Sequence, residues 1–258
     1  MNRAMVIEAH LTYACNLRCP HCNRGVGMGD HTPDLTLEQW EIFLSSIPDW
    51  LKVKGVHILF TGGEPTLVAD LEQFVALTQR MMPMGTAGCG PNGNVWVSIA
   101  SNETTLASRL LLADLHDRYG VFAIGSNKRT GEPTKRFVTD MYLSPVDTGE
   151  QRDHPCEYSW RCGVSVDAEG MTLCPCGGMI DGMLRLGVRT WDWAALTYER
   201  LMRLCGHCGR GLSGRGRRYT RNHEPAAEIF DVHGFRMTRE WKDAVERRSS
   251  AAVGGACP

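Results

Sequence analysis

The chain has 258 residues, with 28 Lys and Arg against 29 Asp and Glu, so its formal net charge is −1. With 43% hydrophobic and 22% charged residues it can bury a core, which excludes an intrinsically disordered chain. The balanced charge excludes a uniformly basic nucleic-acid coat and a uniformly acidic protein. The 11 cysteines are the unusual feature, because they are too few for a tiny disulfide scaffold and too many for an ordinary core.

No targeting signal is recognisable. The first residues lack the charged region, the long apolar run and the cleavage site of a secretory signal. No stretch approaches the roughly 18 uninterrupted apolar residues of a membrane span. We therefore expect a cytoplasmic protein that contacts no membrane, and in a reducing compartment grouped cysteines usually bind metal or carry redox chemistry.

Strand and helix patterns alternate along the first half of the chain. The predicted strands are 5–11, 56–60, 95–99, 121–124 and 137–143, and the predicted helices are 36–47, 70–82 and 106–119. Thr36 and Gln39 form a capping-box pattern at the first helix, and Asp70 can cap the second. The alternation predicts an α/β fold with a parallel sheet or a (β/α) barrel, and the last two strands are too close together for a complete eight-fold barrel.

The pattern changes after Gln151. Residues 163–166 and 171–173 flank a turn and predict a short hairpin. A helix over about 192–204 follows, then a polar Gly/Arg-rich stretch and a short helix near 239–248. We therefore divide the chain into a barrel domain over 1–150, a small hairpin-and-helix domain over 151–210 and a tail over 211–258.

Three cysteines lie close together directly after the first predicted strand, as Cys15, Cys19 and Cys22. Three thiolates of one loop can bind three irons of a cubane and leave the fourth iron open to another ligand. Zinc is the alternative, with His21 as a fourth ligand. A glycine turn with the sequence GGEP follows the second strand, and in parallel sheets both segments lie at the edge where ligands bind.

Together these two motifs resemble the signature of the radical S-adenosylmethionine (radical SAM) superfamily. The segment ACNLRCPHC matches its CxxxCxxC pattern, and Gly62, Gly63, Glu64 and Pro65 match its GGEP motif. The resemblance covers roughly residues 5–145. It implies a partial (β/α)6-type barrel in which the three cysteines hold a 4Fe-4S cluster.

The resemblance also implies how S-adenosylmethionine (SAM) is used. Its amino and carboxylate groups chelate the open iron, and its reductive cleavage yields a 5′-deoxyadenosyl radical that abstracts a hydrogen atom from the substrate. The glycines of the GGEP motif let the backbone approach the SAM amino group, and Glu64 or the neighbouring carbonyls accept its hydrogen bonds. Asn102 and Ser126 are candidates for the ribose or the carboxylate of SAM, although such residues are equally common in turns. The implied electron donor is a flavodoxin- or ferredoxin-like reductase.

Six further cysteines lie between residues 156 and 208. Their placement around a hairpin, with a CxxC after the following helix, resembles the SPASM/twitch extension of radical SAM enzymes and implies a second, auxiliary 4Fe-4S cluster. The expected ligands are Cys162, Cys176, Cys205 and Cys208, with Cys174 or Cys156 as substitutes. A structural zinc site is the alternative, and Cys89 and Cys257 have no assigned role.

Two other features allow a functional and a structural interpretation. Seven arginines and no acidic residue lie between Arg200 and Arg221, a pattern typical of a solvated linker or of a segment that binds a polyanion. Asp140 and Tyr142, on the fifth predicted strand, are candidates for the barrel interior.

We therefore expect a radical SAM enzyme, an oxidoreductase or an isomerase, whose auxiliary cluster accepts an electron from the substrate or helps to position it. Three substrate classes stay open: a small alcohol or sugar-like compound that is dehydrogenated, a peptide that is modified, and a nucleotide or DNA base. The alternative is a non-catalytic iron–sulfur electron carrier or a zinc-binding interaction protein, neither of which needs a GGEP motif.

Overall fold

The computed structural model describes residues 4–17, 24, 26, 33–82, 95–125, 153–156, 159, 162–208, 239–241, 243, 244, 246 and 247. Within this part of the chain, a six-stranded sheet has the strand order β4-β3-β2-β1-β5-β6. The strands are β1 (Met5–Thr12), β2 (Val56–Gly62), β3 (Val95–Ser101), β4 (Phe122–Gly125), β5 (Val164–Asp167) and β6 (Gly170–Thr172). All neighbouring pairs from β4 to β5 are parallel, and β6 returns antiparallel to β5.

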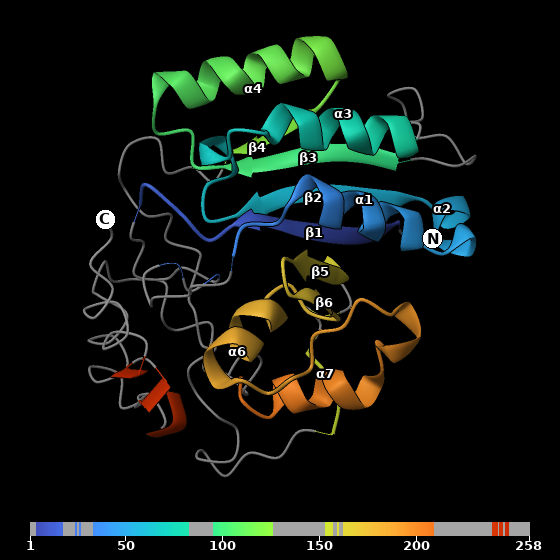
Figure 1. Ribbon diagram of the computed structural model, residues 1–258, viewed down its shortest axis with the longest axis vertical. Helices are drawn as coiled ribbons and strands as arrows, with labels where there is room; N and C mark the ends of the chain where they lie inside the picture. The colour runs from blue at the N-terminus through green and yellow to red at the C-terminus, as the bar shows by residue number, and fades with distance from the viewer. Residues whose placement is uncertain are drawn as a thin grey trace.

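The helices lie in two groups. They are α1 (Leu37–Ser46), α2 (Asp49–Lys54), α3 (Leu71–Met81), α4 (Leu106–Tyr119), α6 (Gly177–Leu184) and α7 (Tyr198–Cys205), with short 3-10 turns η2 (Pro65–Leu67) and η3 (Trp193–Ala195). Figure 1 shows α1, α3 and α4 along the strands β1–β4, whereas α6 and α7 lie beside the hairpin of β5 and β6. The hairpin therefore continues the sheet next to β1 and connects the two groups.

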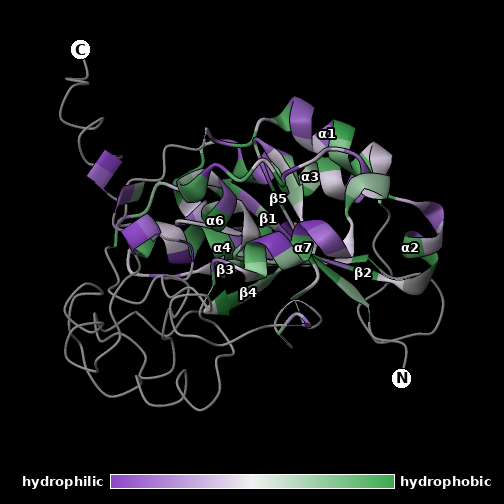
Figure 2. Cartoon of the chain, turned by 90° about the horizontal axis from the view of Figure 1, so that it is seen from below, coloured by the Kyte–Doolittle hydropathy of each residue, from purple (hydrophilic) through white to green (hydrophobic). Residues whose placement is uncertain are grey.

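One face of the sheet is apolar and packs against α1 and α3. Side chains alternate between the faces of a strand, so Ile7, Ala9 and Leu11 of β1 share this face, and all three are fully buried. Trp40 of α1 lies 5.5 Å from Phe60 of β2, ring centre to ring centre. Burial of a large apolar side chain such as Ile7, Leu11 or Phe60 stabilises the fold by roughly 1.5–3 kcal/mol. Helix α1 is amphipathic, and Figure 2 shows that it carries both hydrophilic and hydrophobic residues.

Most local predictions are confirmed. Strands occur at four of the five predicted positions in the first half of the chain, and the 163–173 hairpin forms as β5 and β6. Thr36 and Gln39 make both hydrogen bonds of the capping box at α1. Asp70 precedes α3, but its carboxylate accepts a hydrogen bond from the Gln73 side chain instead of capping a backbone N–H.

The second half differs from the prediction in two places. The helix predicted over 192–204 is divided into η3 and α7, because Asp192 and Thr197 each accept a backbone N–H and so start a separate helix. Helix α6 was not predicted, since its sequence GGMIDGML contains three glycines that disfavour helix in isolation. It forms because Gly177 lies against β6, where an added Cβ would come 2.3 Å from the Thr172 hydroxyl.

Other predictions lie outside the described residues. These are the strand over 137–143 with Asp140 and Tyr142, the domain boundary at 150, and the Gly/Arg-rich stretch after residue 208. The short helix expected near 239–248 is confirmed where the structure describes it, at residues 239–241, 243, 244, 246 and 247. No helix in the described part of the chain is long and apolar enough to cross a membrane.

Candidate functional site

The carboxyl ends of the parallel strands meet at one edge of the sheet. Cys15 follows β1, Glu64 follows β2, Asn102 follows β3, and Asp167 ends β5. Because these strands run in the same direction, all four residues come to the edge where α/β sheets bind their ligands.

The glycines of the GGEP turn let the first cysteine segment approach β2. A Cβ on Gly63 would lie 2.0 Å from the carbonyl oxygen of Ala14, and one on Gly62 would lie 2.2 Å from that of Thr12. The backbone N–H of Gly63 donates to Thr12 at 2.7 Å, and that of Glu64 donates to Ala14 at 2.8 Å. The turn therefore fixes the backbone that leads directly into Cys15.

The Glu64 carboxylate joins the ends of β2 and β3. It is 1% exposed. One oxygen, Oε1, accepts hydrogen bonds from the backbone N–H and the hydroxyl of Thr66 and from the hydroxyl of Ser101, at 2.7–3.1 Å. The other, Oε2, accepts from the backbone N–H of Asn102 at 2.7 Å. A carboxylate with four donors inside the protein is a positioning group, and Pro65 beside it begins η2.

Cys15 lies in a setting that suits a thiolate ligand. Its side chain is half-buried. Its sulfur is 3.4 Å from the backbone N–H of Leu17 and 3.8 Å from the amide nitrogen of Asn102, which also donates to Asn16 at 2.7 Å. Donors directed at a sulfur stabilise its anionic form, so the residues present fit a cluster ligand at this position.

The face of the sheet that turns away from α1 and α3 is polar and buried. Glu8 and His10 of β1 and Asp167 of β5 lie on it, and each is less than 5% exposed. Tyr13 donates a hydrogen bond to Asp167 at 3.0 Å, and its hydroxyl is 3.1 Å from Nδ1 of His10. Buried charged and polar groups are costly unless they are paired, so a cluster of them at a strand edge marks a candidate functional site.

Arg24 connects this polar face with the second group of cysteines. Its guanidinium forms an ion pair with Glu8, and it also donates to the carbonyl oxygen of Pro175 at 2.6 Å. Pro175 stands between Cys174 and Cys176. The side chain of Arg24, two residues after Cys22, therefore reaches the backbone between Cys174 and Cys176.

Burial and charge set the ionisation of this cluster. Burial lowers the pKa of His10 below its ordinary value of 6.5, and the positive charge of Arg24 lowers it further against the opposing effect of Glu8 and Asp167. Burial alone would raise the pKa of Glu8, but Arg24 and His10 lower it by more, so the net shift is below 4.5. The face therefore holds a carboxylate beside a neutral imidazole near neutral pH.

A second histidine, His57, lies on the same face on the neighbouring strand β2. Nε2 of His57 is 2.9 Å from the Ser98 hydroxyl, and its ring stacks on Trp96 with centroids 5.2 Å apart. Burial lowers the pKa of His57 below 6.5, while the charge of Glu8 opposes that shift. The polar face thus extends from β5 across β1 and β2 to β3.

The second group of cysteines lies around α6 and α7. Cys176, Cys205 and Cys208 are buried, whereas Cys162 and Cys174 are half-buried. A hydrogen bond with Cys176, burial, and the nearness of Cys176 and Cys208 raise the pKa of the Cys174 thiol well above 9.0. These three sulfur-bearing side chains are therefore neighbours. Among the described residues, no group of three or more His, Cys, Asp or Glu side chains meets the geometry of a metal site.

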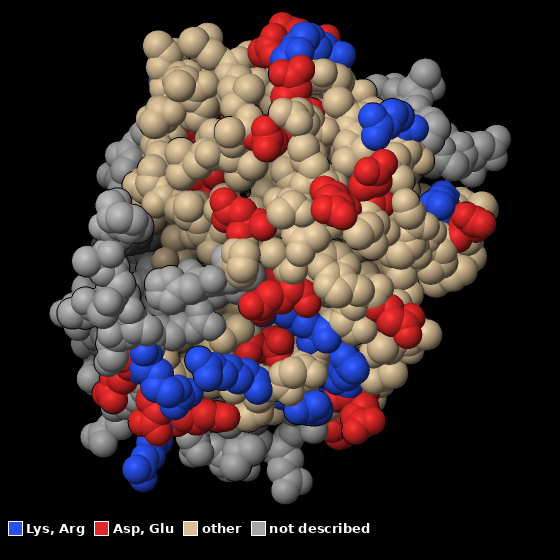
Figure 3. Space-filling model, viewed as in Figure 1, with Lys and Arg blue, Asp and Glu red and all other residues tan. Residues whose placement is uncertain are grey.

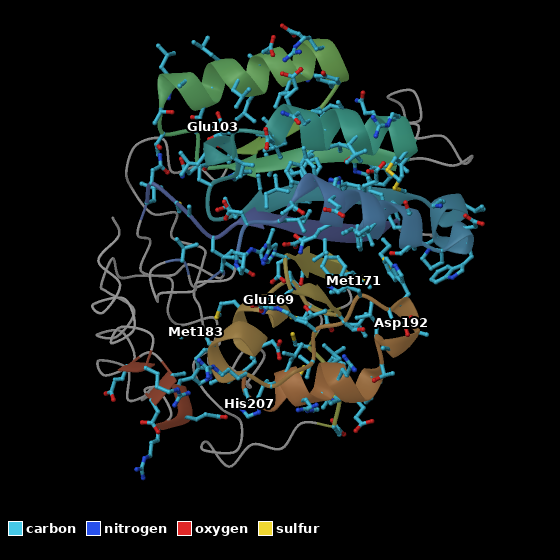
Figure 4. All side chains as sticks on the ribbon, viewed as in Figure 1. Glu103, Glu169, Met171, Met183, Asp192 and His207 are labelled. Atoms are coloured by element: carbon cyan, nitrogen blue, oxygen red, sulfur yellow. The ribbon has the colours of Figure 1, made fainter. Side chains whose placement is uncertain are left out.

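Buried apolar residues enclose this second group. Cys176 and Cys208 belong to a cluster with Trp241, which is fully buried and whose Nε1 donates to the carbonyl oxygen of His207 at 2.9 Å. Figure 4 labels His207 near α6, and it labels Glu169 and Met171 on the hairpin between the sheet and this helical region. The segment around residue 241 is thus part of the structure that surrounds these cysteines.

The first two arginines of the basic segment have structural contacts. Arg200 donates to the carbonyl oxygens of Val188 and Arg189 at 3.0 and 3.2 Å, and Arg203 donates to that of Leu186. Figure 3 shows basic side chains interleaved with acidic ones on the molecular surface over the region of α7. The remaining arginines, from Arg210 onward, lie outside the described residues.

The predicted site residues are thus placed in part. The structure brings Cys15, Gly62, Gly63, Glu64 and Asn102 together, whereas Cys19, Cys22 and Ser126 lie outside the described residues. The buried polar face, with Glu8, His10 and Asp167, was not predicted. The alternation of polar and apolar residues in the first strand was the signal that could have found it.

Comparisons with known proteins agree with this architecture. Residues 10–142, just over half of the 258-residue chain, match the radical SAM superfamily, so the chain belongs to that superfamily. Its members are enzymes that use a 4Fe-4S cluster and SAM. The six-stranded α/β sheet is consistent with a partial barrel of this family.

Two solved structures are similar in part. One is BtrN in complex with AdoMet and 2-DOIA, which is 15% identical, with 80% of this chain and 90% of that one covered and a TM-score of 0.48. The other is Streptococcus suis SuiB bound to its precursor peptide SuiA, which is 18% identical, with 48% of this chain covered and a TM-score of 0.31. This chain covers 24% of the SuiB chain.

Proposed function

We propose that this radical SAM enzyme oxidises a small polar substrate, such as an alcohol or sugar-like compound, with an auxiliary 4Fe-4S cluster in the 162–208 segment. The observation that carries the proposal is the buried polar face of the sheet, whose strand β1 leads to Cys15. A small substrate with hydrogen-bonding groups matches such a face better than an apolar one does.

The residues after the first three strands would bind SAM and its cluster. Cys15, with Cys19 and Cys22, would hold the cluster, which supplies the electron that cleaves SAM into a 5′-deoxyadenosyl radical. Because the Glu64 carboxylate already accepts four hydrogen bonds, the backbone carbonyls of the glycine turn are the better acceptors for the SAM amino group. Glu64 would act by fixing that turn. Asn102, and Ser126 after the fourth strand, would contact the ribose or the carboxylate.

The auxiliary cluster would be held by Cys162, Cys205, Cys208 and either Cys176 or Cys174. The nearness of Cys174, Cys176 and Cys208 supports a thiolate site, and the burial and crowding that raise the pKa of Cys174 are a penalty on the free thiolate. A bound cluster would offset that penalty by stabilising the thiolate forms. The cluster would accept an electron from the substrate, and a flavodoxin- or ferredoxin-like reductase would supply the electron that starts the reaction.

Reconstitution under anaerobic conditions tests the radical chemistry. The full chain is loaded with iron and sulfide, reduced with dithionite and mixed with SAM, and 5′-deoxyadenosine is measured by mass spectrometry. We expect wild type to form it and Cys15→Ala to lose it. Cys257→Ala, which removes a cysteine with no assigned role, is the matched control. Absence of 5′-deoxyadenosine from the loaded wild type would rule the proposal out.

Iron content tests the auxiliary cluster. Two cubanes require about eight irons per chain, and one requires about four. We expect the Cys205→Ala/Cys208→Ala variant to fall from about eight to about four irons while it still cleaves SAM. A wild type that takes up only about four irons has no auxiliary cluster.

A further inference from the structure

His10 has one ring nitrogen that the described protein leaves without a hydrogen-bond partner. The side chain is 1% exposed, and within the described residues its Nε2 has no partner. The nearest acidic atom is Oε2 of Glu8 at 3.9 Å, which is too long for a hydrogen bond. A buried polar atom in this state costs about 1–3 kcal/mol, so an unpaired Nε2 on this polar face points to a ligand.

The hydrogen-bond chain on the other side of the ring fixes which nitrogen carries the proton. Tyr13 donates its hydroxyl hydrogen to Asp167 at 3.0 Å. The Tyr13 oxygen can then only accept from His10, so Nδ1 carries the hydrogen of the 3.1 Å contact. In the neutral ring this leaves Nε2 as a lone-pair acceptor.

Burial is the main reason that the His10 ring stays neutral, while the carboxylates beside it favour a hydrogen-bond donor there. Arg24 opposes protonation of the ring, whereas Glu8 on its own strand and Asp167 on β5 favour it, and burial outweighs the two carboxylates. Nε2 and Oε2 of Glu8 are thus two acceptors, 3.9 Å apart. One ammonium group can donate to both, and a hydroxyl can donate to either.

We propose that His10 is a substrate-recognition residue whose Nε2 accepts a hydrogen bond from a hydroxyl or amine of a small polar substrate, with Glu8 as the second acceptor. This assignment rests on the proposed function, because it gives a role to the same polar face. It narrows the substrate class to compounds that present hydrogen-bond donors there, such as polyols and amino polyols.

Two substitutions distinguish the roles of the two ring nitrogens of His10. His10→Asn keeps an amide nitrogen near the position of Nδ1, so it preserves the donor to Tyr13 and removes the acceptor at Nε2. His10→Gln places an amide oxygen near Nε2 and gives up the contact with Tyr13. His116→Asn is the control, because His116 lies on α4, where its Nδ1 is 2.9 Å from the backbone carbonyl oxygen of Val121.

Binding is measured with three probes of similar ring size on the full, cluster-loaded chain. They are myo-inositol as the hydroxyl probe, 1,3-diaminocyclohexane as the amine probe and cyclohexanone as a probe that can accept hydrogen bonds but cannot donate them. We expect at least one donor probe to bind to wild type and to the His116→Asn control with equal affinity. Its affinity for His10→Asn should be about tenfold lower, which corresponds to one lost hydrogen bond of about 1.4 kcal/mol. Its affinity for His10→Gln should be higher than its affinity for His10→Asn. Equal binding to wild type and His10→Asn, or no binding of either donor probe, would overturn the assignment.

Nitrogen-15 spectra of the oxidised, loaded chain provide a readout that needs no probe. We expect a protonated Nδ1 and an unprotonated Nε2 for His10, and a change of tautomer in Tyr13→Phe. A protonated Nε2 in wild type would also overturn the assignment. The proposed function is judged separately by 5′-deoxyadenosine formation in wild type, so its failure is distinguished from a failure of the His10 assignment alone.

Discussion

Glu64 shows how one carboxylate can position two strand ends without touching solvent. Its four donors come from η2 and from the residues that end and follow β3. Replacing it with Gln keeps the shape but converts one acceptor oxygen into a donor that faces other donors. We expect Glu64→Gln to lower the free energy of unfolding by about 1–3 kcal/mol in urea titrations and to weaken SAM binding.

Glu41→Gln is the matched control for this prediction. Glu41 lies on the surface of α1, where it forms a 3.5 Å ion pair with Arg80 and is half-exposed. Exposed pairs of this kind contribute about 0–1 kcal/mol. If both variants unfold alike, the Glu64 network has no special role.

The buried histidine also makes stability depend on pH. The pKa of His10 is lower in the folded chain than its ordinary 6.5, so the unfolded chain takes up the proton first as the pH falls. The contribution to stability is therefore complete above pH 6.5 and is lost as the pH falls toward the folded pKa. Glu8, with a pKa below 4.5, adds a second loss at more acidic pH.

Urea unfolding at pH 7.5 and pH 5.5 checks this dependence. We expect His10 to contribute a loss of up to about 1.4 kcal/mol in wild type, because pH 5.5 lies one unit below the ordinary histidine pKa of 6.5. His10→Asn should flatten most of the change and leave the smaller part that His57 contributes. A wild-type profile that is level over this interval would contradict the expected burial of a neutral His10.

At the scale of single residues, the sequence identified the groups that match a motif and missed those that depend on the tertiary structure. Cys15, Glu64 and Asn102 follow predicted strands, so their meeting at one edge could be predicted from strand direction alone. Glu8 and His10 stand out by alternation within one strand. Only the packing of α1 and α3 shows which face is inside, and only the return of β5 beside β1 brings Asp167 to Tyr13.

At the scale of elements, the junction of β1 and β2 depends on the absence of a side chain. The Cβ of Gly63→Ala would meet backbone atoms of Tyr13 and Ala14, which cannot rotate away as a side chain can. We expect this variant to displace the turn before Cys15 and to take up fewer irons at the first cluster. Its yield of 5′-deoxyadenosine should fall at least tenfold.

Gly120→Ala provides the comparison. Gly120 ends α4 with φ 65°, and an added Cβ would have no neighbour within 4 Å. Its cost is the conformational penalty of about 1–2 kcal/mol for a left-handed residue, without an effect on iron uptake. Comparable iron loss in both variants would mean that general destabilisation, and not the junction, explains the Gly63 result.

Element boundaries in the second half were harder to predict because they depend on local backbone geometry and on tertiary packing. The caps at Asp192 and Thr197 are residues that also occur inside helices, and their effect depends on backbone geometry. Helix α6 has poor intrinsic propensity, yet its glycines are what allow close packing on β6 and α7. Local sequence favours a loop there, and the tertiary contacts override it.

At the scale of the whole molecule, the sheet and the second cysteine group form a continuous structure. β5 pairs with β1, and Arg24 reaches from Glu8 to the backbone between Cys174 and Cys176. A substrate on the polar face would therefore lie beside residues of both regions. The proposed function requires this placement, because in it one region starts the reaction and the other takes part in completing it.

Trp241 offers a test of whether the segment near the end of the sequence supports the second cysteine group. It is fully buried in the same apolar cluster as Cys176 and Cys208, and its indole N–H donates a hydrogen bond to the carbonyl oxygen of His207. Truncation of such a side chain costs about 3–5 kcal/mol where the cavity cannot collapse. That loss falls on the residues that would surround the auxiliary cluster, and not on the β1–β2 junction.

We therefore expect Trp241→Ala to lower iron content from about eight toward about four per chain while SAM cleavage persists. Trp50→Ala, at a position that is 55% exposed, should keep the full iron content. Iron analysis and 5′-deoxyadenosine formation on the same samples give the comparison. A local role of this segment predicts that the cluster held by Cys15 survives when the second cluster is lost. If Trp241→Ala instead loses SAM cleavage in proportion to its loss of iron, the segment stabilises the entire fold.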